Sequence, residues 1–433
     1  MKWILAGSAG ALALTALTAA TPGEDSWIPF DDPAIEYYNA PVDDAFARLG
    51  QQIQSGKVKL EFNEKGRGYL ESLLKALKIN VDSQVLVFSK TSFQTPKIGP
   101  RDPRAIFFND EVSVGSVQNS DVLELAALDP KQGVIFYTFN NVKTDKPEFD
   151  RRDVCLQCHQ GLNTVGVPGI VVSSVYAGGD GMPAFRGSHK GTDGRSKMED
   201  RWGGWYVTGT HGEQRHMGNA VSHDPANPTD LEVYGTQNLL SLEKKADLNR
   251  PTYLVKTSDI VALMTLEHQT RMTNLMTRVG WEARIAITAG KNPVEQENVR
   301  TDLEDMVTYM VFADEALLHD SVKGVSTFTE TFQKRGPRDS KGRSLRDFDL
   351  NTRLFKYPLS YMIYTEAFDN LPDAVRSQVY MRLHDVLTGR DENPKFKLLS
   401  AEKRQAALEI LRETKKNIPA YFREATVPTS AGN

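Results

Sequence analysis

The chain contains only two cysteines in 433 residues and carries almost no net charge. So few cysteines exclude a fold held together by a disulfide framework. The 52 lysines and arginines against 56 aspartates and glutamates leave a formal charge of −4, which gives no basic footprint for nucleic acid or for an anionic membrane surface. Hydrophobic residues make up 40% of the chain, enough for a folded core, so wholesale disorder is excluded as well.

Long uncharged apolar runs are missing beyond the first twenty residues. Residues 1–20 begin with Met1-Lys2, continue without charge and end in Thr18-Ala19-Ala20 before a polar stretch. This order predicts a secretory signal peptide that is cleaved; the alternative is an uncleaved membrane anchor, because 18 uncharged residues barely span a bilayer. We therefore expect a periplasmic or otherwise exported mature protein without a transmembrane span.

Residues 21–145 predict a helix-plus-sheet region. The spacing of apolar residues is helical between Asp43 and Asn80 and changes to that of short strands between Gln84 and Asn141. The turn from Asp129 to Gly133 predicts a hairpin, and the whole region a small, mostly antiparallel sheet. The last strand is expected to end near Asn141, before a charged stretch. The expected strands are 85–88, 105–108, 112–117, 122–128 and 134–138.

Residues 146–230 predict an irregular segment, and residues 250–420 a helical region. Between Gly161 and Ala220 lie 14 of the 32 glycines together with bulky aromatic residues, which indicates a loop wrapped around a large apolar group. The fold class expected for the chain is α+β, mainly α. The expected C-terminal helices are one that Ser258 caps and that ends near Val279, and further ones at 294–319, 357–368, 372–387 and 401–414.

Both cysteines belong to one motif, Cys155-Leu156-Gln157-Cys158-His159, which has the C-x-x-C-H spacing of c-type haem attachment. Two thiols three positions apart on a helical turn can each bond to one vinyl group of haem. The adjacent imidazole then points at the iron as its proximal ligand. The sequence therefore predicts one covalent haem c, with Cys155 and Cys158 as attachment points and His159 on the iron.

Two other sites remain possible for this motif. A zinc centre would need His or carboxylate ligands from elsewhere in the chain to complete its four. A thioredoxin-like dithiol would need the cysteines at the start of a helix that directly follows a strand. The charged stretch expected between the last strand and Cys155 argues against the dithiol.

The motif resembles that of the c-type cytochromes. Phrases elsewhere in the chain are similar to those of large exported bacterial proteins that carry a cytochrome c domain with a single haem: FNDEVSVGSVQ, LDPKQGVIFYT, RWGGWYVTGTHGEQRHMGN and RLFKYPLSYMIY. The resemblance implies the cofactor but no particular activity. The motif follows an entire sheet-containing region rather than standing near the start, so the fold of small cytochromes is not implied for the whole chain.

The second axial ligand would decide the chemistry, because Met or His closes the iron for electron transfer and an open position permits ligand binding or peroxide chemistry. The TGTHGEQRHMGN stretch offers three candidates, and a glycine-flanked turn and a helical stripe offer one each. Structural packing is the competing explanation for every one of them. The five candidates are His211, His216, Met217, Met182 and His268.

Aromatic and basic residues near these candidates predict the walls of a haem pocket. Trp202, Trp205 and Tyr206 can pack against a porphyrin, and Arg201 can neutralise a propionate. Arg215 and the basic loop from Lys334 to Asp347 are further sources of positive charge, although a solvated turn explains that loop equally well. Glu267 could act as an acid or base if the distal side is open.

Two functions of different class follow from these features. The first is a periplasmic electron-transfer cytochrome that exchanges single electrons with exported redox proteins. The second is a haem-dependent oxidoreductase, such as a peroxidase, or a haem-based sensor with an open distal site. Either one requires the cytochrome c maturation machinery as a partner during biogenesis.

Overall fold

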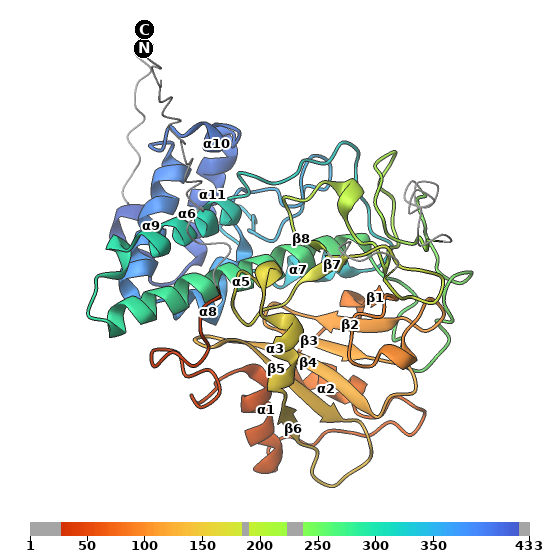
Figure 1. Cartoon of the computed structure of the whole chain (residues 1–433). Coiled ribbons are helices and arrows are strands. Elements are labelled where there is room, and N and C mark those ends of the chain that lie inside the picture. The colour runs from red at the N-terminus through yellow and green to blue at the C-terminus, as the bar shows by residue number, and fades with distance from the viewer. Residues whose placement is uncertain (1–26, 184–189, 223–236, 424–433) are drawn as a thin grey trace, which may run out of the picture.

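The structure is a computed structural model, and it describes residues 27–183, 190–222 and 237–423 (Figure 1). It contains a seven-stranded antiparallel sheet, a separate two-stranded sheet and a set of helices toward the C-terminus, which confirms the α+β class. The predicted signal peptide, residues 1–20, lies outside the described residues. Within the described ranges, none of the helices has the length and apolarity needed to cross a bilayer.

The large sheet has the strand order β6-β5-β4-β3-β2-β1-β9, and every neighbouring pair is antiparallel. The expected hairpin is confirmed, with Asp129 paired to Gly133 across the turn. A seventh strand comes from the glycine-rich segment and adds to the edge opposite β6. The strands are β1 (Val85–Val87), β2 (Arg104–Phe108), β3 (Val112–Ser116), β4 (Val122–Asp129), β5 (Gly133–Asn140), β6 (Phe149–Arg151) and β9 (Trp205–Tyr206).

One face of this sheet is completely buried. Alternate residues such as Phe107, Val114 and Leu125 have almost no exposed surface, as the two-residue period of a strand requires. Helices α1 (Ala45–Gln54) and α2 (Leu70–Ala76) contribute to the same apolar cluster and lie behind the sheet in the view of Figure 1. The helical pattern between Asp43 and Asn80 is thus two short helices that cover one face.

The opposite face, here called the half-covered face, carries smaller and more polar side chains. Its residues are paired across the strands as Ile106 with Gly115, Gly115 with Glu124, and Ala126 with Phe136. Most are only partly buried, in contrast to those of the other face. The name half-covered face is used here for Arg104, Ile106, Ser113, Gly115, Glu124, Ala126, Phe136 and Thr138. The remaining side chains on this side, such as Val87, Phe108 and Leu128, are buried in the main core.

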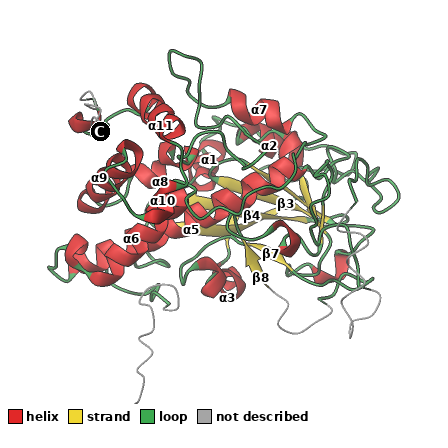
Figure 2. Cartoon of the chain, turned by 90° about the horizontal axis from the view of Figure 1, so that it is seen from above, coloured by secondary structure: helices red, strands yellow, loops and turns green. Residues whose placement is uncertain are grey.

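The 29-residue helix α5 (Ile260–Thr288) covers one end of the half-covered face. Gln269 donates to the Asn109 carbonyl at 2.6 Å, and Thr277 approaches Gly133 at the β4–β5 turn. Figure 2 shows α5 passing over the sheet, with the short helix α3 (Leu156–His159) on the side away from α1 and α2. The uncovered end of this face is therefore the one that faces the Cys155–His159 segment.

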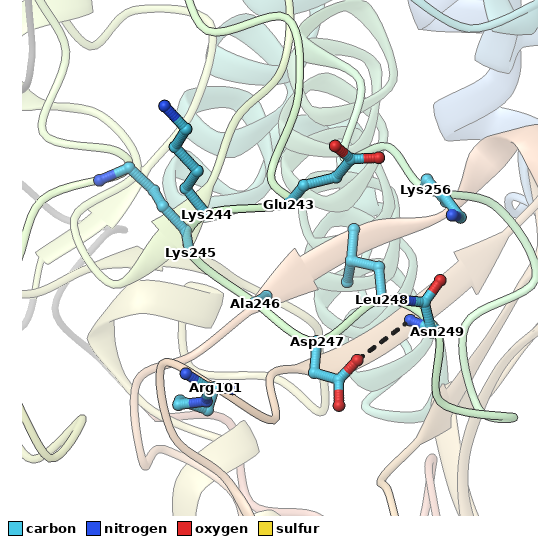
Figure 3. Close-up of a pocket in the computed structure, with 9 residues that line it drawn as sticks. All are labelled: Arg101, Glu243, Lys244, Lys245, Ala246, Asp247, Leu248, Asn249 and Lys256. Atoms are coloured by element: carbon cyan, nitrogen blue, oxygen red, sulfur yellow. Dashed lines mark hydrogen bonds between the residues drawn. The ribbon is translucent and has the colours of Figure 1, made fainter.

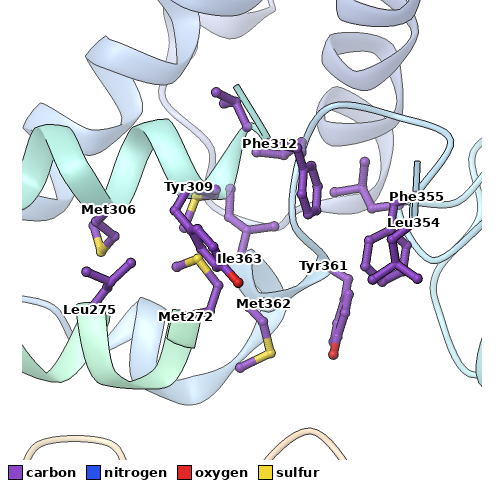
Figure 4. Packing of buried hydrophobic residues seen from close by; sticks show 14 of the residues in the cluster. Met272, Leu275, Met306, Tyr309, Phe312, Leu354, Phe355, Tyr361, Met362 and Ile363 are labelled. Atoms are coloured by element: carbon purple, nitrogen blue, oxygen red, sulfur yellow. The ribbon is translucent and has the colours of Figure 1, made fainter. Parts of the chain in front are cut away.

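The helix expected to be capped by Ser258 is capped one residue later, begins at Ile260 and extends nine residues beyond Val279. Asp259 is its N-cap and accepts from the backbone N–H groups of Val261 and Ala262. Ser258 was the wrong choice because its hydroxyl is engaged with strands, donating to Tyr206 and accepting from Leu86. The apolar stripe of the helix packs into the main core, where Met272 and Leu275 lie against Met306 and Tyr309 (Figure 4).

The C-terminal helices agree with expectation at two positions and differ at two. Residues 294–319 form a helix only over Glu297–Met310 (α6), and residues 357–368 form a 3₁₀ turn at Tyr361–Tyr364 followed by the short α8 (Glu366–Asp369). Thr365 accepts from the N–H of Phe368 and so starts a new helix in the middle of the predicted one. The remaining helices are α7 (Phe328–Lys334), α9 (Asp373–Thr388), α10 (Pro394–Lys397) and α11 (Ala401–Thr414).

The glycine-rich segment is organised around α5. It forms the small sheet of β7 (Val172–Ser174) and β8 (Lys190–Thr192), and Thr192 Oγ1 donates to Glu267 on α5 at 2.7 Å. Trp202 is fully buried in the main core. The part of this loop from residue 190 to 222 therefore folds around the protein's own core, in place of the separate large apolar group that the sequence suggested.

Asp259→Ala should destabilise the protein by about 2–4 kcal/mol, more than loss of an ordinary helix cap. The buried carboxylate accepts from five donors, which include the backbone of Val325 and Ser326 as well as the helix. Ser400→Ala, at an exposed cap with a single hydrogen bond, is the matched control and should lose about 1 kcal/mol or less. Urea unfolding measures both; equal losses would contradict the linking role of Asp259.

Candidate functional site

The Cys155–His159 segment follows directly after a strand. β6 ends at Arg151, a 3₁₀ turn spans Asp153–Cys155, and α3 completes one helical turn to His159. The expectation that the last strand ends near Asn141 is therefore wrong, because the charged stretch pairs with β5 through Phe149 to Arg151. The motif thus does follow a strand and starts a helix, so its position no longer counts against a dithiol. Leu156 anchors the turn in the core and leaves the Cys155 thiol half-buried and the Cys158 thiol exposed, both of them unbonded.

His159 is held by Gly169 at both its backbone and its ring. The His159 carbonyl accepts from the Gly169 N–H at 2.9 Å, and Nδ1 lies 3.0 Å from the Gly169 carbonyl oxygen. A carbonyl oxygen can only accept, so Nδ1 carries the proton and Nε2 keeps its lone pair. Within the described residues Nε2 makes no hydrogen bond. Burial lowers the pKa of His159, which favours the neutral imidazole that a metal ion requires.

Asn274 on α5 fixes the backbone that holds His159. Its side chain donates to the Ile170 carbonyl at 2.8 Å and accepts from the Ile170 N–H at 3.2 Å. A Cβ on Gly169 would lie 2.2 Å from Asn274 Oδ1, so this approach requires glycine. The orientation of the His159 ring thus depends on the main helix of the protein through two short links. Such backing of a ligand's second nitrogen is typical of metal-binding histidines.

The ring of His159 lies on the half-covered face of the sheet. Its centroid is 4.7 Å from that of Phe136 on β5, which pairs with Ala126 on β4. Two residues along β4 on the same face, Glu124 binds Arg104 at 2.5 Å. The motif therefore borders a surface that is apolar at its centre and charged at its far edge.

The electrostatics of the thiols disfavour a dithiol enzyme. Burial, followed by the charge of Glu124, raises the pKa of Cys155, whereas redox-active thiols require a lowered pKa. A zinc centre finds no support either, because the described part of the chain contains no group of three His, Cys, Asp or Glu side chains placed to hold a metal ion. A haem brings its own four nitrogens and needs from the protein only the axial imidazole and the two thiols.

His211 and His216 are engaged within their own loop. Carbonyl oxygens contact both nitrogens of His211, at 2.7 Å from Gln214 and 3.0 Å from Gln237. Nδ1 of His216 accepts from the N–H of Gly218, so the ring proton sits on Nε2 and blocks the nitrogen that would bind iron. Burial, and then the charge of His211, lowers the pKa of His216 to about 3.

His268 and Met217 lie in other surroundings. Nε2 of His268 is 2.8 Å from Ser360 Oγ, and burial lowers the pKa of the ring to about 3. The ring stacks on Tyr309 at 5.3 Å in an aromatic cluster of the C-terminal core. The sulfur of Met217 accepts from Ser174 Oγ at 3.5 Å. No contact joins either residue to the Cys155–His159 segment in the described ranges.

Met182 lies at the β1 edge of the sheet, where Gly181 packs against Phe88 and Gly99, four strand spacings or about 19 Å from β5. Its side chain is 46% exposed, on a turn that Gly181 closes with a positive φ of 86°. The Gly181 carbonyl accepts from the N–H of Lys90, so the turn lies beside the loop from Ser89 to Gln94. That loop reaches the half-covered face, because Ser92 donates to Glu124 at 2.6 Å.

The predicted walls of the pocket lie far from the motif. Trp205 and Tyr206 form β9, five strand spacings from the strand that contacts His159, or about 24 Å. Arg201 is buried and binds Glu267 at 3.1 Å, and burial raises the pKa of Glu267 to about 7 although the charge of Arg201 opposes it. Arg201, Trp202 and Trp205 therefore share a core with Glu267, and the structure does not bring them together with His159.

The basic loop from Lys334 to Asp347 is neutralised by nearby carboxylates. Arg335 and Arg346 both bind Asp110, and Arg343 binds Glu409. Another basic site, a cavity of about 330 Å³, lies between Arg101, the turn from Glu243 to Asn249, and Lys256 (Figure 3). Its lysines point in different directions, so no single anion position is defined.

Sequence reasoning missed the residues that surround His159. Gly169 follows a proline ten positions after His159, a turn signal that could have marked it. Arg104 and Glu124 stand in strands whose alternate residues are apolar, and this alternation could have shown that one face of the sheet is partly polar. Asn274 had no local signal, since its partner is 104 positions away.

A comparison with protein-family models, with curated proteins and with solved structures found no match for this chain.

Gly169→Ala should destabilise the protein by about 1–3 kcal/mol, because the new methyl group would collide with Asn274 and Thr164. Gly161→Ala is the matched control in the same segment, since nothing lies within 4 Å of its Cβ, and it should change stability by less than about 0.5 kcal/mol. Urea unfolding of both variants provides the measurement. A neutral Gly169→Ala would show that Asn274 does not fix the His159 loop.

Proposed function

We propose that the protein is a single-haem c-type cytochrome that transfers electrons. Cys155 and Cys158 would hold the haem through thioether bonds, and His159 Nε2 would be the proximal ligand. The observation that carries this proposal is the hydrogen bond of His159 Nδ1 to Gly169, which leaves Nε2 available beside two unbonded thiols. When bound, the haem supplies a one-electron iron couple.

The position of the motif suits exchange of electrons with another protein. The Cys158 thiol is exposed, so one edge of a porphyrin attached there would lie near the surface. Two apolar side chains beside the motif are exposed to solvent: Val154 is 56% exposed and Leu162 is 62% exposed. An exposed apolar rim beside a redox edge fits the small, transient contacts of electron-transfer partners. We infer that these partners are exported redox proteins, in line with the predicted signal peptide.

We infer that Met182 provides the second axial ligand, a role that requires its turn to move from the β1 edge of the sheet toward the haem. Its thioether is exposed, and its turn adjoins the loop that is bonded to Glu124 on the half-covered face. Methionine opposite histidine closes the iron to small ligands and raises the reduction potential, as suits a carrier. The short, glycine-flanked turn lets the backbone adopt the approach such a ligand needs.

A haem with an open distal position is the second candidate function. The observation in its favour is that His211, His216, Met217 and His268 all have other partners within the chain. If Met182 also stays off the iron, the protein would bind small ligands as a peroxidase-like enzyme or a sensor would.

The protein produced in a periplasm that matures cytochromes should carry one covalent haem. Intact mass should exceed that of the polypeptide by one haem, and the haem should survive denaturing electrophoresis. Cys155→Ser and Cys158→Ser should each leave a single thioether and change the reduced α-band, and the double variant should release the haem on denaturation. A wild-type protein of bare polypeptide mass, without a Soret band, would overturn the proposal.

Met182→Ala should convert low-spin iron to high-spin iron that binds carbon monoxide, because the strong second ligand is lost. Met217→Ala is the matched control and should leave the spectrum unchanged, since its sulfur is occupied by Ser174. Absorption spectra with and without carbon monoxide provide the measurement. High-spin, ligand-binding iron in the wild-type protein would instead support the open-site function.

A further inference from the structure

Arg104 and Glu124 form an ion pair on the half-covered face, on the side of Glu124 away from Thr138. The two side chains are only 17% and 15% exposed, and their nitrogen and oxygen lie 2.5 Å apart. Glu124 also accepts from Ser92 at 2.6 Å and Gln94 at 2.7 Å. Burial alone would raise the pKa of Glu124, but the charge of Arg104 and these donors hold it below its usual value. The carboxylate is therefore ionised and well supplied with donors.

Arg104, in contrast, is poorly supplied with acceptors. Its only side-chain hydrogen bond within the described ranges runs from Nη1 to Glu124, so Nη2 makes none there. Nε is fully buried without an acceptor. A buried guanidinium donor is normally paired, because an unmet one costs the free energy of its lost hydration. Glu124 therefore holds Arg104 through Nη1. Nε and Nη2 remain able to donate to an anion that is not part of the described polypeptide.

The surface between Arg104 and His159 is suited to a flat apolar group. Glu124 and Ala126 share one face of β4, and Ala126 pairs with Phe136, against which the His159 ring packs. Gly115 has no side chain and Ala126 only a methyl group there, and Ile106 adds a larger apolar side chain. Arg104 on β2 lies three strand spacings, about 14 Å, from Phe136 on β5. An anion bound to Arg104 would thus lie at the edge of a group centred over this face.

We propose that Arg104 binds a carboxylate of the haem, one of its propionates, through Nε and Nη2, and that Glu124 positions Arg104 for this contact. The inference rests on the proposed function, because the haem is its ligand. A bidentate guanidinium–carboxylate contact gives direction as well as charge, which lysine cannot reproduce. The pair would also set the reduction potential, since Arg104 adds positive charge near the iron and Glu124 adds negative charge.

Opposite shifts of the reduction potential test this pair. Arg104→Gln removes a positive charge, so ferric iron is less disfavoured and the potential should fall. Glu124→Gln removes a negative charge, so the potential should rise. We expect each shift to reach about 59 mV, which corresponds to a tenfold change in a one-electron equilibrium. Arg338→Gln, at a guanidinium that binds Asp347 in the C-terminal half, is the matched control and should leave the potential unchanged.

The propionate contact itself has a separate readout. Resonance Raman bands of propionate bending should move in Arg104→Gln and in Arg104→Lys, and only the lysine variant should keep a near-native potential. If Arg104→Gln does not fold, Arg104→Lys and Glu124→Gln decide the matter. Unchanged Raman bands and potentials in folded, haem-bearing variants would overturn the role of Arg104 and leave the proposed function intact. A wild-type protein without haem would overturn both.

Discussion

The bond from the His159 ring to the Gly169 carbonyl governs the site, and Asn274 on the main helix fixes the next residue, Ile170, through both its N–H and its carbonyl. One short chain of contacts thus links the motif on the sheet side of the molecule to the 29-residue helix α5. The link decides which ring nitrogen carries the proton, and with it which nitrogen can meet a metal ion. It also explains why a glycine stands at 169, where a methyl group would meet the Asn274 side chain.

The sheet contributes to the site through the difference between its two faces. One face is filled by α1 and α2 and serves only the core. The other is covered by α5 at one end, and its remaining end carries small side chains beside the Arg104–Glu124 pair. Burying a charged pair costs free energy unless its groups are hydrogen-bonded, and Glu124 meets this condition through Arg104, Ser92 and Gln94. Phe136 on this surface packs against His159, and Arg104 at its margin has one buried donor, Nε, without an acceptor.

The sequence predicted the strands, the long helix and the Cys155–His159 motif because each has a local signal of period or spacing. The sequence-based predictions were wrong or incomplete where residues far apart in the chain determine the local conformation or the contacts of a side chain. Phe149 to Arg151 form a strand through pairing with β5, although their charges indicate a loop. His216 and His268 are both candidates to bind iron in the sequence, and only the structure shows that Gly218 engages Nδ1 of the first and Ser360 engages Nε2 of the second. Trp205 is near the motif in sequence but lies at the other edge of the sheet.

The central claim is that His159 meets iron through Nε2 while Nδ1 keeps its bond to Gly169. A crystal structure of the protein matured with haem tests it most directly. The account predicts thioether bonds at Cys155 and Cys158, iron on His159 Nε2, and Nδ1 still about 3.0 Å from the Gly169 carbonyl. A disulfide between Cys155 and Cys158, or a His159 ring turned so that Nε2 bonds to the protein, would contradict it.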